Sequence, residues 1–395
     1  MLGDWASVLS RNAGTIILRP RFATNYGFAD RYHNVVGAIA EEDATLDVGG
    51  WQMPQRRASE HRTVTDERVR IYGGTPTLYG APLAQGPKDL QGADVAFLGI
   101  PWQAPSPERW LGGVMPNYDT LLSPSTFRQN SLVHQGYLPE LDLDVFERLR
   151  LVDYGDADVV HDMKQTLANV EMRVKDIIDA GCIPITIGGN AGPSTYPVLK
   201  AVAERADGPT AVLNFDAHHD NQRGEWEDDD PRQPRWGSTW ARRILALPGV
   251  DPARYHHVGL RGPINDRETF VRFTERGVKR EHIYTSQDLK QARRDGFERW
   301  ADTLARKIAA GAGKVWIGVD PDVLDIGSNP DFAIDPFGLT ADEIIELVHR
   351  VGIAAGREKF GGIAFMALPY NARAVHFICL YILLYALAGI VAHTK

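Results

Sequence analysis

The chain has 395 residues, of which 44% are hydrophobic and 24% charged, an ordinary composition for a globular protein with one large core. The formal net charge is −8 and no block of Lys or Arg occurs, which disfavours nucleic acid as a partner. Two cysteines are too few for a disulfide framework or a zinc-thiolate site. The first residues lack the basic and apolar stretches of a signal peptide, so we expect a cytoplasmic protein.

Residues 1–90 are rich in Arg, Gly, Pro and acidic side chains and contain no long apolar period. This composition predicts an extended N-terminal arm that forms an interface rather than a core. The pattern changes after residue 90, and residues 91–395 are expected to form one α/β domain.

Within that domain, short apolar runs typical of buried strands alternate with apolar residues at helical spacing. Strands are expected within residues 93–102, 149–160, 183–190, 210–220, 255–263, 314–325 and 360–369. Helices are expected within residues 163–181, 194–205, 297–311 and 340–352, the last with Thr340 as its N-cap. This alternation predicts a mainly parallel sheet covered by helices on both faces, with ligands bound at the carboxyl ends of its strands.

The stretch from Ala374 to Ala392 contains 19 residues, and His376 is its one strongly polar side chain. It is long enough to cross a bilayer, which leaves a membrane anchor as an alternative. We favour a buried helix in the core or at a subunit seam, because the chain has a soluble composition and no second stretch of this kind.

Two acidic clusters follow predicted strands. In the segment FDAHHD, Asp216, His218 and Asp220 alternate along the chain, so in an extended conformation they face one side. Asp320 and Asp322 repeat this spacing after a later strand. Carboxylates and imidazole suit a divalent transition metal, and two such clusters at one sheet edge can share a pair of ions. The alternative is that these residues only form turns and cap helices.

The segments VAFLGIP, ITIGGN, NFDAHHD, VGLRG and GVDPDVLD resemble those of the ureohydrolase family, which includes arginase and agmatinase, in the same order and at similar spacing. The resemblance covers about residues 90–395. It implies a three-layer α/β/α fold, trimers or hexamers, and hydrolysis of guanidino C–N bonds by a hydroxide that bridges two Mn²⁺ or Ni²⁺ ions. It also implies that five of the six family metal ligands are present, namely Asp216, His218, Asp220, Asp320 and Asp322.

The remaining family positions are altered. Ala191 stands where the family has the sixth ligand, a histidine, and Asn190 precedes it. Trp236 replaces a histidine near the substrate, and Met366 replaces the glutamate that pairs with the guanidinium group. Residues 326–338 replace the Gly-Thr-Gly-Thr substrate loop. Asn190, Trp236 and Met366 are therefore candidates for the substrate pocket, and no residue is assigned as catalytic.

These changes affect three parts of the family chemistry. Without the sixth ligand, one ion keeps only carboxylates, whereas the other keeps His218. Met366 removes the anion that pairs with a guanidinium, and breaking a buried pair costs about 3–5 kcal/mol. Trp236 removes a proton shuttle of a kind that contributes about 10²–10⁴-fold. Alternatively, the loop at Ala191 is misaligned and His218 or His219 covers for it, while Trp236 and Met366 are ordinary core residues.

Three hypotheses follow. In the first, the chain is a degenerate subunit that supports a catalytically intact paralogue in a hexamer-like hetero-oligomer, like the non-catalytic subunit of two-component guanidine or biguanide hydrolases. Nickel or manganese then resides in the partner or binds weakly here, and the acidic cluster is structural, with Asp220 and Asp322 bonded to loop N–H groups. In the second, the chain is itself a hydrolase with a pocket for a bulkier or less cationic substrate. In the third, it is a membrane-attached or scaffolding protein.

Overall fold

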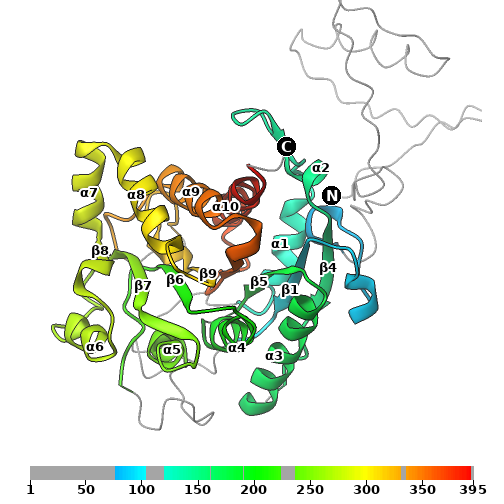
Figure 1. Ribbon diagram of the computed structural model, residues 1–395, viewed down its shortest axis with the longest axis horizontal. Coiled ribbons are helices and arrows are strands. Elements are labelled where there is room, and N and C mark those ends of the chain that lie inside the picture. The colour runs from blue at the N-terminus through cyan, green and yellow to red at the C-terminus, as the bar shows by residue number, and fades with distance from the viewer. Residues whose placement is uncertain are drawn as a thin grey trace, which may run out of the picture. The chain divides into compact units, whose positions relative to one another are not determined.

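The computed structural model describes residues 76–103, 120–160, 162–189, 191–223, 236–330 and 335–392. Their central feature is an eight-stranded sheet in which all neighbouring strands run parallel (Figure 1). From edge to edge, the strands are β4 (Leu151–Asp156), β1 (Val95–Ile100), β5 (Ile183–Gly188), β10 (Phe360–Phe365), β9 (Lys314–Val319), β6 (Thr210–Phe215), β7 (Val250–Leu260) and β8 (Ile283–Thr285). The predicted parallel sheet is thus confirmed.

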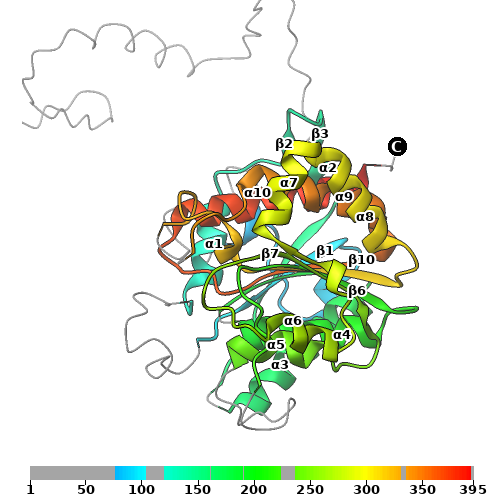
Figure 2. The same ribbon diagram turned by 90° about the vertical axis from the view of Figure 1, so that its left-hand side faces the viewer.

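Helices cover both faces of the sheet (Figure 2). One face carries α3 (Met163–Asp179), α4 (Ala191–Glu204), α5 (Trp236–Ile244) and α6 (Thr269–Glu275). The other carries α1 (Ser123–Ser131), α7 (Ser286–Asp295), α8 (Phe297–Ala309), α9 (Ala341–Lys359) and α10 (Arg373–Val391). The predicted three-layer α/β/α architecture is confirmed.

The central strands are apolar on both faces because both faces pack against helices. In β6, Leu213 and Phe215 belong to the cluster under α8, α9 and α10, whereas Val212 belongs to the cluster under α4 and α5. Alternate side chains therefore fill the two cores, as the period of a strand requires. The remaining regular elements are a small hairpin of β2 (Tyr137–Leu138) and β3 (Leu143–Asp144), the short helix α2 (Val145–Arg148), and the 3₁₀ turns η1 (Leu78–Gly80), η2 (Pro87–Leu90), η3 (Arg280–His282) and η4 (Pro321–Val323).

The expected long elements are present, with shifted ends. The helix expected within 194–205 begins earlier, at Ala191, and the helix expected within 340–352 continues to Lys359. Thr340 is the N-cap of α9, and its backbone N–H donates to Glu343 Oε2 at 2.9 Å in a capping box. Five of the described α-helices were not expected, because their sequences are short or lack a clear apolar period: α1, α2, α5, α6 and α7.

The boundary of the N-terminal arm requires a correction. Residues 78–90 were expected in the arm, but Leu78, Tyr79 and Leu90 are buried in the α/β domain. The Tyr79 hydroxyl donates to the Leu380 carbonyl of α10 at 3.0 Å. Burial of these side chains holds the segment against the domain although its sequence has no regular period. Residues 1–75 lie outside the described residues, so the arm remains a prediction there.

Helix α10 corresponds to the long apolar stretch near the end of the sequence. Among the described helices it is the one long and apolar enough to cross a membrane, and 72% of its most apolar window is buried inside the protein. It packs against α9 at Gly352 and Gly389, where the two backbones approach so closely that a Cβ at Gly389 would overlap the His349 carbonyl oxygen. The structure therefore places this helix in the core, as we favoured.

The close crossing of α9 and α10 generates a stability prediction. We expect Gly389→Val to lower the free energy of unfolding by about 1–3 kcal/mol or more, because the added carbons overlap the α9 backbone. Ala374→Val on the exposed start of α10 is the matched control and should change stability little. Urea unfolding followed by circular dichroism checks this, and equal loss in both variants would contradict the close packing.

Candidate metal centre

The candidate site lies where β6 and β9 end side by side. Phe215 pairs with Val319 in the register of these neighbouring strands. Asp216 and Asp320 follow directly, and the Asp320 N–H donates to the Phe215 carbonyl at 2.9 Å. The parallel sheet thus delivers two acidic residues to the same level of one edge, the carboxyl end, where open α/β sheets bind ligands.

Three of the predicted ligands come together closely. One ligand atom each from Asp216, His218 and Asp322 lies within 4.8 Å of the others. His218 Nδ1 lies 2.8 Å from Asp322 Oδ2, and the His218 N–H donates to Asp216 Oδ1 at 2.7 Å. Asp322 Oδ1 also accepts the Ala217 N–H at 3.0 Å. These bonds hold the two carboxylates and the imidazole in a fixed arrangement.

The other two predicted ligands have different partners. Asp220 Oδ2 accepts a bond from the indole N–H of Trp240 at 2.8 Å. Asp320 Oδ1 accepts the Asp322 N–H at 2.9 Å and so caps η4. The expectation that residues 216–220 form an extended segment is wrong, because the chain bends after Phe215 and Asp220 has a φ of +40°. Asp220 therefore reaches the site through a turn rather than by strand alternation.

If the acidic cluster is structural, Asp220 and Asp322 were expected to bond to loop N–H groups. Asp322 does so, whereas Asp220 bonds to an indole N–H instead. His219 does not join the cluster. Its Nδ1 accepts the Asn221 N–H at 2.9 Å, and its own N–H donates to Asn265 Oδ1 at 2.9 Å. Burial lowers the pKa of His219 to about 4. Its bonds place it in the loop structure, so it does not cover for the missing sixth ligand.

Burial gives the acidic cluster unusual electrostatics. Burial and the neighbouring carboxylates raise the pKa values of Asp216 and Asp320 well above the ordinary value. Burial raises the pKa of Asp220 to about 7, against the opposing effect of the His218 charge. Burial also acts to raise the pKa of Asp322, but the adjacent His218 imidazolium holds it below its ordinary value. The carboxylates thus repel one another and favour a cation among them.

His218 supplies such a cation in the protein itself. Burial acts to lower its pKa, but Asp322 and Asp335 on either side raise it to about 11. Asp335 was not predicted from the sequence, and its Oδ2 lies 2.9 Å from His218 Nε2. No spacing rule identifies this pair, because 117 positions separate the two residues.

Arg261, in the VGLRG segment, is a second residue whose role the sequence did not indicate. Its guanidinium donates to the backbone carbonyls of the strand-end loops around the site, which belong to Gly259, Asp322, Val323, Leu324, Asp335 and Pro336. Its own N–H donates to the Ala217 carbonyl at 2.9 Å. Arg261 therefore fixes the ends of β6, β7 and β9 relative to one another.

Ala191 and Met366, two of the altered family positions, lie on the α4 and α5 side of the sheet. Ala191 is the first residue of α4 and is 2% exposed, and its methyl side chain has no atom that can ligate a metal. Met366 follows β10, is fully buried, and shares one apolar cluster with Ala191 and Trp240. Trp236 begins α5, but its side chain lies outside the described set, as does the whole of Asn190.

Among the described residues, the donor set fits one divalent ion better than two. Asp216, His218 and Asp322 provide an imidazole nitrogen and carboxylate oxygens within reach of one another, which suits Mn²⁺ or Ni²⁺. A second ion beside Asp220 and Asp320 would have no imidazole from position 191, because a methyl group cannot ligate a metal.

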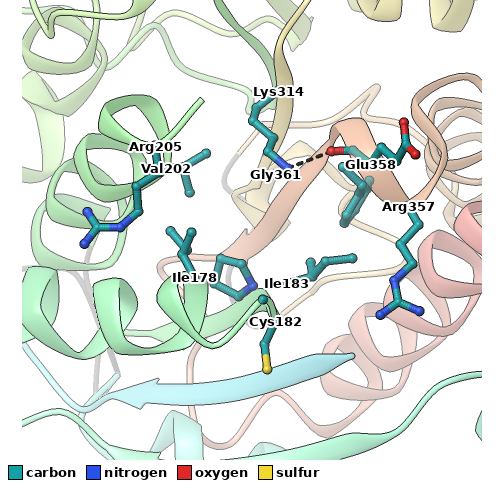
Figure 3. A pocket seen from close by; sticks show the side chains of 12 residues that line it. Ile178, Cys182, Ile183, Val202, Arg205, Lys314, Arg357, Glu358 and Gly361 are labelled. Carbon is teal, nitrogen blue, oxygen red and sulfur yellow. Dashed lines mark hydrogen bonds between the residues drawn. The ribbon is translucent and has the colours of Figure 1, made fainter. Parts of the chain in front are cut away.

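A cavity of about 420 Å³ lies at the opposite end of the sheet, where β5, β9 and β10 begin (Figure 3). Among its lining residues, Lys314 Nζ donates to the Glu358 carbonyl at 2.7 Å. The side chains of Arg205 and Arg357 point away from each other, and each pairs with a carboxylate, Asp179 and Asp94 respectively. This cavity is separate from the acidic cluster.

Comparison with known proteins identifies the class. The sequence matches the arginase family over residues 93–362, and the chain therefore belongs to that family. It is 24% identical over 304 residues to a guanidinobutyrase from Pseudomonas aeruginosa, covering 73% of this chain and 84% of the relative. It is 27% identical over 268 residues to an agmatinase from Chromobacterium violaceum, covering 67% and 74%. The predicted resemblance to ureohydrolases is confirmed.

Solved structures agree on the fold. Proclavaminate amidino hydrolase from Streptomyces clavuligerus superposes with a TM-score of 0.66 at 23% identity, covering 82% of this chain and all of that one. A formiminoglutamase from Trypanosoma cruzi, solved with Mn²⁺, superposes with a TM-score of 0.64 at 19% identity, covering 80% and 98%. At these identities the likeness concerns the fold alone.

The mutual repulsion of the carboxylates generates a prediction for the metal-free chain. Because the pKa of Asp320 is raised in the folded state, the folded chain holds a proton that the unfolded chain releases as the pH rises above about 4. Stability should therefore fall as the pH rises through the raised pKa. Asp320→Asn keeps the acceptor for the Asp322 N–H and removes the charge, so it should stabilise the metal-free chain at pH 8 by on the order of 1 kcal/mol.

Thermal unfolding in EDTA at pH 4.5 and pH 8 measures this effect, which should be larger at pH 8. Asp342→Asn, at an exposed position in the first turn of α9, is the matched control and should have little effect at either pH. A less stable Asp320→Asn variant at pH 8 would show that the carboxylate is needed for folding and that repulsion is not the dominant effect.

Proposed function

We propose that this chain is a subunit of a metal-dependent hydrolase complex that cleaves C–N bonds of guanidine- or biguanide-type substrates, and that an intact paralogue performs the catalysis. The observation that carries this proposal is the apolar cluster of Ala191 and Met366 beside the acidic site. One position lacks the donor of the second ion, and the other lacks the anion that a guanidinium requires. Relatives named guanidinobutyrase and agmatinase support the reaction class.

The residues that remain support ion binding better than turnover. Asp216, His218 and Asp322 would hold one ion, which would supply a bound water of lowered pKa. Arg261 keeps the surrounding loops in place through their backbone carbonyls. Met366 presents a buried thioether where a cationic substrate needs a carboxylate, and an unpaired buried guanidinium is costly. A charged guanidino group is therefore a poor occupant of this chain's own site.

The assembly and substrate form the finer part of the proposal. The partner would be a ureohydrolase paralogue with all six ligands, in a hexamer-like hetero-oligomer in the cytoplasm, with Ni²⁺ or Mn²⁺ mainly in the partner. Family members that form symmetric rings allow a paralogue to occupy an equivalent position, which makes such an assembly accessible. The substrate we favour is a biguanide such as metformin, which extends the resemblance to the non-catalytic subunit of a metformin hydrolase.

A second candidate function rests on the retained donors. The ligand atoms of Asp216, His218 and Asp322 lie close together, and the pKa values of the acidic cluster are strongly perturbed. Both features are common at working sites. In this alternative the chain is a self-sufficient hydrolase, and Met366 with Trp236 forms a wall for a bulkier or less cationic guanidino substrate.

The subunit proposal predicts the outcome of a reconstitution. The chain purified alone, loaded with Ni²⁺ or Mn²⁺, should release no amine from metformin, agmatine or guanidinobutyrate, because its site lacks the anion for the guanidinium. Co-expressed with the intact paralogue, it should co-purify and give an active complex. The control is a paralogue whose own metal-binding aspartates are changed to asparagine, and its complex should be inactive. Activity of the chain alone, or of the control complex, would favour the self-sufficient hydrolase.

If position 191 lacks the sixth metal ligand, restoring a histidine there should increase the number of ions that the chain binds. Elemental analysis after Mn²⁺ loading and desalting should give at most one ion per wild-type chain, because position 191 has no donor. Ala191→His should raise this toward two, provided that thermal unfolding shows a folded variant. Ala191→Val fills similar space without a donor and should match wild type. Two ions in the wild-type chain, or no gain with histidine, would contradict the assigned role of position 191.

A further inference from the structure

Asp335 occupies a position in the site that the ligand pattern does not explain. It lies in residues 326–338, the segment that replaces the Gly-Thr-Gly-Thr loop, and it is 5% exposed. Its Oδ2 faces His218 Nε2 at 2.9 Å, while His218 Nδ1 faces Asp322 on the other side. The imidazole is therefore bonded at both nitrogens, and the two carboxylates fix the plane and the direction of the ring.

The placement of Asp335 is itself built by other residues. Its backbone carbonyl accepts bonds from Arg261 Nε at 3.3 Å and Nη2 at 3.1 Å. Its carboxylate lies against the Cα of Gly262, where an added Cβ would overlap the Cγ and both carboxylate oxygens of Asp335. Gly262 has a φ of +82°, a conformation that L side chains rarely adopt. Arg261 thus fixes the backbone of Asp335, and the absence of a side chain at Gly262 leaves room for the carboxylate beside the imidazole.

A metal-binding histidine generally donates its second ring N–H to a carboxylate or carbonyl, which sets the tautomer and the ring orientation. Here Nε2 has such an acceptor, and Nδ1 is directed toward Asp322 and Asp216. We propose that Asp335 is the positioning residue that holds His218 with Nδ1 directed into the ion site. The segment that no longer resembles a substrate loop thereby supports the metal ligand. This inference rests on the proposal that the chain binds an ion at this cluster.

Mn²⁺ affinity measured by electron paramagnetic resonance tests the role directly. Asp335→Ala should weaken binding about 10–100-fold, the usual effect of removing such a partner. Asp335→Asn keeps an acceptor oxygen and should lose less. Gly262→Ala leaves the carboxylate in the chain but displaces it, so it should also weaken binding. Asp342→Asn removes one exposed charge elsewhere and should bind like wild type. If Asp335→Ala binds Mn²⁺ as tightly as wild type, the proposal is overturned. Tighter binding would also overturn it, because it would show that Asp335 competes with the ion for His218.

A second readout separates this inference from the metal proposal. In metal-free protein labelled with ring-¹⁵N histidine, the Nε2–H signal of His218 is assigned by its absence in His218→Gln. That signal should be protected from exchange in wild type and lost in Asp335→Ala. If wild type binds no Mn²⁺, the ion-binding part of the proposed function fails. Loss of the signal in Asp335→Ala then still supports positioning, and its retention overturns it.

Discussion

Several carboxylates share a space from which solvent is largely excluded, and the structure of this site follows from that constraint. Asp216 and Asp320 are brought together because β6 and β9 are parallel neighbours that end at the same level. Their repulsion cannot be relieved by water. Raised pKa values of Asp216 and Asp320 relieve part of the repulsion by protonation, and His218, bonded to Asp322 and Asp335, adds a positive charge. The same groups that could hold a metal ion also bond to one another in the folded chain.

The positions that match the family pattern and those that differ from it have different surroundings in the folded chain. Asp322 is fixed by bonds to the Ala217 N–H and to His218, whereas Asp220 accepts the indole N–H of Trp240. The replaced positions, Ala191 and Met366, have become part of an apolar core with Trp240. An acidic cluster that contributes to loop structure has reason to persist whether or not the site is catalytic. Retained ligands are therefore a weaker sign of activity than their number suggests.

The central strands, the longer helices and the location of the site were predictable from the sequence, because they depend on local apolar periods and on residues next to strand ends. Asp216 and Asp320 were found in this way. The bend after Phe215 and the contact of Trp240 with Asp220 were not, since a turn with positive φ leaves no periodic signal. Asp335 was not predicted for a related reason. Its contact with His218 depends on Arg261 and Gly262, and no regular sequence spacing relates these residues to Asp335.

Arg261 has a consequence for how this protein can change over evolutionary time. Its guanidinium contacts backbone oxygens, which every amino acid has, rather than the side chains of the loops that it joins. Substitutions in those loops leave these bonds available. The backbone conformation of these loops therefore depends little on which side chains they carry. A loop can change its side chains and keep the same conformation. Through this single arginine, the backbone conformation of the loops can be conserved while their side chains, and so the chemistry of the site, change.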